Sequence, residues 1–358
     1  MWAFARRGAA VLAAALVFFL ALFPTGRYLT RAAWEEAQIL SRRRSIADLV
    51  TKGGVPVDER AKLELVLAAR AFATDSLDLK ARESFTTFSQ LQHDTLVLLV
   101  SGTRRDWLSA KTWWFPIVGR VPYKGYFDYH DASAEAQQLE SDGYDTYVRP
   151  ASAFSTLGFF NDPVLSTTIR MDSAGLANTV IHELTHNTYY ARGQTSFNES
   201  FASFLGGRGA EEFFRSRGDS ALAKHAADEW ADDKVLAAFW GALYTRVDSA
   251  FHAHPEGTAA ARKARLASRE AIYAEARGVL VREVGPKLKR FTPRALEHAR
   301  IDNATLMARR VYATDLDIFD AVFQREGSDL RKAWRRIVTL AKSRPGDPFG
   351  AIREWLLS

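Results

Sequence analysis

Residues 182–186 read His-Glu-Leu-Thr-His, which places two imidazoles four residues apart with a carboxylate directly after the first. On an α-helix, residues four apart lie on one face about one turn apart, so both rings can reach a single ion. Glu183 would then stand beside the coordination position left for water and could act as a general base. The pattern predicts a hydrolytic zinc site with His182 and His186 as ligands, and hence a metallopeptidase.

The flanking residues predict an amphipathic helix from about Ser173 to Tyr190. Asp172 is suited to cap the start of this helix, and Gly193 is suited to follow its end. One apolar stripe recurs at helical spacing on the side away from both histidines. Its members are Leu176, Val180, Ile181 and Leu184. We therefore expect the imidazoles to face a cleft. The alternative is a pair of ordinary surface or core histidines.

A catalytic zinc keeps three protein ligands and one water, so a third donor is needed. Glu199 is the predicted third ligand, because it opens a second helix with an apolar face that a short turn could return to the first. Ser196 and Glu199 also match a capping box, in which the glutamate would bond only the backbone at its own helix start. Asp172 is a weaker substitute as ligand. With no cysteine in the chain and no later pair of histidines at metal spacing, Glu199 is favoured.

The chain resembles the putative aminopeptidase family of bacterial zincin-type metallopeptidases, in which a glutamate is the third zinc ligand. The likeness runs from about Ala32 onward. Related chains often carry a cysteine pair around residues 114–120 and a lipid-modified cysteine after the leader. This chain has no cysteine, so neither a disulfide nor a lipid anchor carries over. The resemblance rests on residues 111–128, 153–160, 182–186 and 197–202.

The resemblance implies hydrolysis of peptide bonds by a zinc-activated water, with Glu183 as general base and one zinc ion per chain. Aminopeptidase activity follows from the family alone. The alternatives are a zinc endopeptidase and a catalytically silent, zinc-stabilised scaffold at the membrane. A tetrahedral oxyanion needs a further hydrogen-bond donor, for which Tyr312 is the candidate and Tyr189 and Tyr190 are alternatives.

The composition is that of a folded protein, because 47% of the 358 residues are hydrophobic. The 48 basic residues are interleaved with 42 acidic ones, which gives a net charge of +6. No basic stripe with stacking aromatics is present, so a nucleic-acid partner is not expected. The expected partner is a peptide substrate, and the sequence does not determine the oligomeric state.

The amino-terminal residues predict export. Arg6 and Arg7 precede an uncharged apolar run over residues 8–23, which ends at Pro24. The residues around Pro24 do not form a small-residue cleavage site, which favours an uncleaved inner-membrane anchor with the catalytic region on the periplasmic side. The alternatives are secretion after cleavage and, less consistent with the terminal position, a buried helix of a cytosolic protein.

The expected fold class is α+β and predominantly helical. It is zincin-like, with a small sheet beside the active-site helix and a helical C-terminal lobe. The aromatic block at 113–127 is either a packed corner or a substrate-binding wall. The predicted regions are 1–26 (anchor or signal), 27–218 (helical hairpin and catalytic region) and 219–358 (helical lobe). The predicted elements are helices at 32–50, 57–79, 132–141, 219–254, 258–284, 301–324 and 328–342, and strands at 96–100, 144–148 and 153–160.

Overall fold

The structure is a computed structural model, which describes residues 18, 22–91, 97–115, 119–150 and 163–358. The predicted anchor at 8–23 and the predicted edge strand at 153–160 lie almost wholly or wholly outside the described residues, so both stay predictions. Among the helices that are described, none is both long enough and apolar enough to cross a bilayer.

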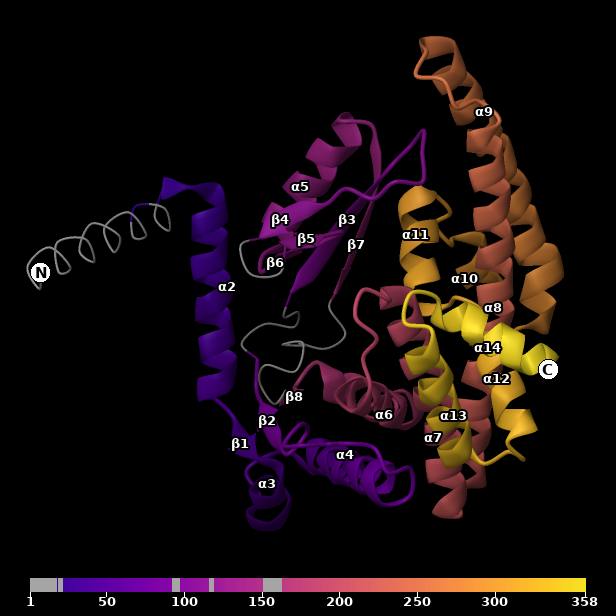
Figure 1. Ribbon diagram of the computed structural model, residues 1–358. Coiled ribbons are helices and arrows are strands. Elements are labelled where there is room, and N and C mark those ends of the chain that lie inside the picture. Colours follow the sequence, from indigo (N-terminus) through magenta and orange to yellow (C-terminus); the bar gives the residue numbers. More distant parts are fainter. Residues whose placement is uncertain (1–17, 19–21, 92–96, 116–118, 151–162) are drawn as a thin grey trace, which may run out of the picture.

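Two consecutive helices, α6 (Ser173–Thr188) and α7 (Thr195–Ser216), pack closely against each other at the centre of the molecule (Figure 1). Helix α4 (Val57–Asp75) packs on α6, and α8 (Ser220–His252) packs on α7. The apolar stripe predicted for α6 is confirmed, because all of its members are fully buried in the main core. They are Leu176, Val180, Ile181 and Leu184.

A three-stranded antiparallel sheet has β3 (Leu98–Arg104) between β6 (Lys124–Tyr126) and β7 (Tyr144–Pro150). Helix α5 (Tyr129–Ser141) covers it, packed through Ala132, Ala136 and Leu139. The strand predicted at 144–148 is confirmed as part of β7. Smaller pairings join β4 (Trp113–Phe115) to β5 (Gly119–Val121), and β2 (Thr87–Ser89) to both β1 (Arg44–Ser45) and β8 (Val164–Leu165).

The helix predicted at 32–50 is wrong as a continuous element. Helix α2 (Pro24–Ser41) begins earlier, and β1 interrupts the chain before α3 (Ile46–Lys52). The interruption has two causes: Arg44 and Ser45 pair with β2, and the hydroxyl of Ser45 accepts a hydrogen bond from the backbone N–H of Asp48, at 3.3 Å, which starts a new helix.

The helix predicted at 301–324 is likewise two helices, α11 (Asn303–Tyr312) and α12 (Leu316–Arg325). Asp315 adopts a left-handed conformation with φ 50°, which a continuous helix does not allow. The backbone N–H of Thr314 donates to the hydroxyl of Ser200 on α7 at 3.0 Å, so the break is also held by a tertiary contact.

The remaining helices complete a helical region that follows α7. A second core, centred on α8 and α9, adjoins the main one. The α+β, predominantly helical fold class is confirmed, whereas the division of the chain near residue 218 stays a prediction. The helices are α9 (Ala259–Val279), α10 (Pro293–Glu297), α13 (Leu330–Ser343) and α14 (Pro348–Leu357), with short π and 3₁₀ turns at 280–284, 285–287 and 168–170.

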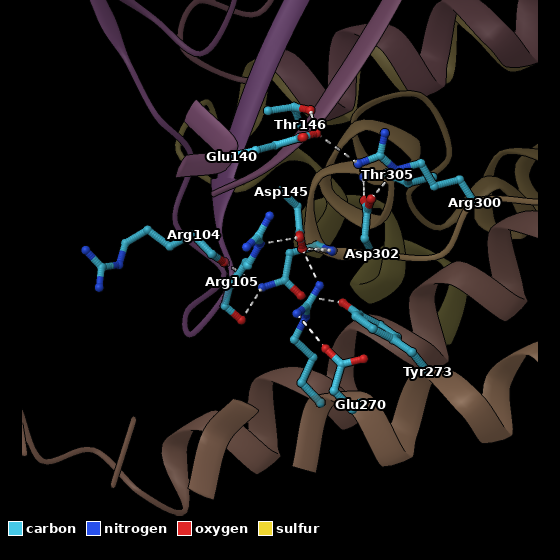
Figure 2. A network of polar contacts seen from close by, with 12 residues as sticks. Arg104, Arg105, Glu140, Asp145, Thr146, Glu270, Tyr273, Arg300, Asp302 and Thr305 are labelled. Atoms are coloured by element: carbon cyan, nitrogen blue, oxygen red, sulfur yellow. Dashed lines mark hydrogen bonds and ion pairs between the residues drawn. The ribbon is translucent and has the colours of Figure 1, made fainter. Parts of the chain in front are cut away.

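A buried polar network ties the sheet to this helical region (Figure 2). The carboxylate of Asp145 on β7 accepts hydrogen bonds from Arg105 at 3.2 Å, from Arg269 on α9 at 2.5 Å, and from the backbone N–H of Asn303 at 3.0 Å. The side-chain amide of Asn303 in turn donates to the carbonyl of Arg104 at 2.6 Å. Because α11 also packs on α7, this network fixes the sheet relative to the central helix pair.

Candidate metal centre

Helix α6 starts where the sequence predicts. The carboxylate of Asp172 accepts a hydrogen bond from the backbone N–H of Gly175 at 2.8 Å, as an N-cap residue does. The helix ends at Thr188, two residues before the predicted end, and Tyr189 is already extended. Gly193, with φ +76°, takes the left-handed conformation in the turn that leads to α7.

Two features bring α7 close to α6. Gly206 has no side chain where α6 approaches, and a Cβ there would come within 2.2 Å of the side-chain oxygen of Asn178. At the start of α7, Phe197 and Phe201 are buried in the main core. The close approach at Gly206 and the buried rings together set where Glu199 lies.

Three side chains converge between α6 and α7. The Nε2 atoms of His182 and His186 lie 3.3 Å apart, and their rings are nearly perpendicular, at 82°. The carboxylate oxygens of Glu199 lie 3.4 Å from Nε2 of His182 and 3.7 Å from Nε2 of His186. These three side chains are 15%, 20% and 19% exposed, so solvent still reaches the point where they meet.

The electrostatics of the three groups are coupled. Burial alone would raise the pKa of Glu199, but hydrogen bonds and charge from the two imidazoles outweigh it and lower the pKa to about 2. Burial would lower the pKa of His186, yet the bond to Glu199 and its charge raise it. The carboxylate is therefore ionised and attracts a cation to this point.

The donor set fits a zinc ion. Two imidazole nitrogens and one carboxylate are ligands that zinc takes in catalytic sites, and their atoms lie within 4.8 Å of one another. A shared cation would stabilise an arrangement that brings two imidazole nitrogens and a carboxylate this close together. The other ring nitrogen of His186, Nδ1, is buried and finds no hydrogen-bond partner among the described residues.

The alternatives for the third donor fare differently in the structure. Helix α7 begins at Thr195 after Gln194, with no side-chain cap, so Ser196 and Glu199 do not form a capping box. Asp172 does not join the two histidines. Its carboxylate lies 3.4 Å from Nε2 of His225 on α8, and it also forms an ion pair with Arg290.

Glu183 and the three candidate tyrosines have different outcomes in the structure. The negative charge of Glu183, the residue after His182 on α6, contributes to raising the pKa of His186. Tyr190 lies next to His186, with ring centroids 6.3 Å apart. Tyr189 instead packs against the main core. The side chain of Tyr312, the last residue of α11, lies outside what the structure describes, so its role stays a prediction.

Tyr123 is a residue that sequence reasoning did not single out. It lies just before β6, and its hydroxyl is within electrostatic range of Glu199 and of Tyr190. Burial raises the pKa of Tyr123, and the negative charge of Glu199 raises it further. The available signal was the aromatic block at 113–127, which gave no reason to prefer one ring over another.

The sequence model of a family described as putative aminopeptidase matches residues 27–347. No curated protein and no solved structure matches the chain. The family match covers most of the chain and includes all three converging side chains.

Proposed function

The chain belongs to the putative aminopeptidase family, and from that premise we propose that it is a zinc-dependent peptidase, specifically an aminopeptidase. His182, His186 and Glu199 would hold one zinc ion. The observation that carries this proposal is the convergence of their ligand atoms, with Nε2 to Nε2 at 3.3 Å and the carboxylate oxygens at 3.4 and 3.7 Å.

In this proposal the zinc ion and the side chains have separate catalytic roles. A zinc ion held by these three residues supplies a Lewis acid, which lowers the pKa of a water and polarises the scissile carbonyl. The carboxylate of Glu183 takes the proton from the attacking water and then delivers it to the leaving nitrogen. Its position directly after His182 on α6 keeps it beside the ligands without making it one of them.

A hydrogen-bond donor to the oxyanion is the remaining requirement. We propose Tyr123 for this role ahead of Tyr312, since the hydroxyl of Tyr123 lies within electrostatic range of Glu199. Its raised pKa keeps the phenol protonated and able to donate. Replacing Tyr123 with Phe removes only the hydroxyl, so it should lower kcat by about 10²-fold or more while the metal stays bound.

The zincin-like fold and the location are parts of the same proposal. The three-stranded sheet β6–β3–β7 would be the small sheet of a zincin-like fold. The apolar run at 8–23 would anchor the chain in the inner membrane, with the catalytic region in the periplasm. Retention of the full chain in the membrane fraction after alkaline extraction tests the anchor.

The experiment that tests the function combines metal content with turnover. We expect purified protein to carry about one zinc per chain, set by the single three-ligand cluster, and to cleave short peptides with a free amino end. Chelation should abolish cleavage and added zinc should restore it. Glu183→Gln should keep the zinc and lose turnover, whereas Glu275→Gln, at an exposed ion pair with Arg246, should keep both.

Each alternative has its own outcome. Equal cleavage of amino-blocked peptides would identify an endopeptidase with the same centre. Bound zinc without cleavage of any peptide would favour the silent scaffold. Unchanged turnover in Glu183→Gln would overturn the hydrolytic mechanism.

A further inference from the structure

Helix α2 lies at the edge of the molecule and presents one exposed face along its length (Figure 1). We propose that this face lies along the surface of a bilayer that contains anionic phospholipids. The inference goes beyond the proposed peptidase activity and rests on the proposed function only for the anchor at 8–23. It assigns a partner to a surface that carries none of the three candidate ligands.

The rest of the protein holds α2 by its opposite face. The ring of Tyr28 packs on that of Phe115 on β4, with centroids 5.5 Å apart. Further along α2, Ile39 is buried, and its carbonyl accepts a hydrogen bond from the hydroxyl of Ser89 on β2 at 2.8 Å. Tyr28 and Ile39 are separated by about three helical turns, so they lie on the same side of α2. That side is therefore fixed to the fold, and the outward side is left open.

The outward face combines aromatic and basic side chains. Its members recur at helical spacing from the N-cap onward, and all of them are exposed. They are Phe23, Arg27, Thr30, Trp34, Ala37 and Ser41. Trp34 is 64% exposed, and Arg31 at the margin of this face is exposed too. The stripe has no acidic member, since Glu35, which lies 3.9 Å from Arg31, is half-buried on the other side. Aromatic and basic residues without acidic ones are typical of a helix that rests on an anionic lipid surface.

The chain directly before α2 favours lipid as the partner. The uncharged apolar run at 8–23 ends where the helix begins, so Arg27 follows the run by only about 6 Å along a helix. With that run in a bilayer, the first turn of α2 lies at the depth of the lipid phosphates, and α2 itself is not apolar enough to cross.

The position of Trp34 then determines the direction of α2. Trp34 lies about 16 Å beyond Phe23 along the helix axis, so it reaches the lipid only if α2 runs along the surface. Tryptophan side chains favour the interface between lipid and water, and Arg27 and Arg31 would pair with lipid phosphates. These preferences favour a helix that lies flat on the bilayer over one that rises from it.

The test measures whether α2 touches the bilayer along its length. Because the chain has no cysteine, one introduced cysteine is its only thiol and can carry a fluorescent label. Full-length Thr30→Cys and Ala37→Cys proteins are labelled and reconstituted in vesicles that contain phosphatidylglycerol. We expect lipids with a spin label near the headgroup to quench both labels. Val57→Cys, at a 75% exposed position on α4, is the control and should not be quenched.

Further variants of the Ala37→Cys protein test the two kinds of side chain. Arg27→Gln together with Arg31→Gln should weaken docking by about thirtyfold and lower the quenching, as should vesicles of phosphatidylcholine alone. Trp34→Ala should also lower the quenching. Trp114→Ala, which removes a 59% exposed tryptophan of β4, is the matched control and should leave it unchanged.

Three outcomes would overturn the docking. Quenching at Ala37 no stronger than at Val57, in a chain that resists alkaline extraction, would mean that the anchor holds but α2 leaves the surface. Equal quenching in phosphatidylcholine vesicles would rule out recognition of anionic lipid. A full chain that does not bind the vesicles would overturn the anchor and the docking together. Failure of the peptidase proposal looks different, because no peptide is hydrolysed while the quenching at Thr30 and Ala37 remains.

Discussion

The side-chain amide of Asn198 pairs with both backbone groups of Ala191, through two hydrogen bonds of 2.8 Å. Asn198 is 1% exposed and directly precedes Glu199, while Ala191 lies between the end of α6 and the start of α7. This pairing closes the turn that returns the chain from the histidine helix to the glutamate helix. It therefore sets the distance between ligands that come from different helices.

Asn198→Ala should weaken both the fold and the metal site. Two buried backbone groups of Ala191 would lose their partners, which should lower the free energy of unfolding by about 2–4 kcal/mol. The looser turn should reduce zinc affinity about tenfold or more. Urea unfolding and zinc titration measure the two effects. Asn187→Ala is the control: it removes a half-buried 3.1 Å hydrogen bond from α6 to the hydroxyl of Ser84, and it should cost less than about 1.5 kcal/mol and leave zinc affinity unchanged. Equal zinc affinity in both variants would contradict the role of Asn198.

The local pattern around α6 was sufficient to predict that helix. Its capping residue Asp172 and its buried stripe are properties of nearby residues, and the structure shows both. The spacing of apolar residues did not predict the break between α11 and α12, because contacts with distant residues determine the backbone there. The stretch has helical spacing throughout, yet the hydrogen bond from Thr314 to Ser200 and the left-handed conformation of Asp315 divide it. The electrostatic influence of Glu199 on Tyr123 likewise depends on how the sheet is placed relative to α7, and no residue spacing encodes that.

Gly206→Ala should separate the two central helices. A Cβ at this position would meet the side-chain oxygen of Asn178 at 2.2 Å and the backbone oxygen of the same residue at 3.0 Å, and the backbone cannot move aside alone. We expect a loss of about 1–3 kcal/mol of stability, from overpacking, together with weaker zinc binding. Gly241→Ala on α8 is the matched control, because its nearest neighbour is 3.8 Å away, at Arg310. It should stabilise the protein by up to about 1 kcal/mol. If both alanines were tolerated equally in thermal unfolding, close packing at Gly206 would not position the site.

Asp320 should make stability depend on pH in the acid range. Burial alone would raise its pKa, but hydrogen bonds from Arg208 on α7 and Lys234 on α8 outweigh that effect and lower it. A carboxyl whose pKa is lower in the folded state stabilises the protein above the unfolded pKa of about 3.9, and this stabilisation is lost as the pH falls through the folded value. Asp320→Asn should therefore cost about 3 kcal/mol at pH 7, and the difference from the unaltered protein should shrink as the pH falls below about 4.

The measurement for Asp320 is urea unfolding of both proteins between pH 7 and pH 3. Asp315→Asn is the control, because its ion pair with Arg353 is exposed on both sides and is worth at most about 1 kcal/mol. A difference for Asp320→Asn that is constant with pH would show that its ionisation does not stabilise the packing of α12 on α7 and α8.

Glu199→Gln and Ser196→Ala separate the two roles that the sequence allows for this turn of α7. If Glu199 is the third ligand, the amide removes the negative charge that offsets the cation, and zinc content should fall from about one per chain to well below half at micromolar free zinc. Ser196→Ala should change neither zinc content nor stability by more than about 0.5 kcal/mol, because the serine makes no cap at the start of α7. The reverse pattern, with zinc retained in Glu199→Gln and helix stability lost in Ser196→Ala, would return Glu199 to a capping role and leave the two imidazoles without a third donor.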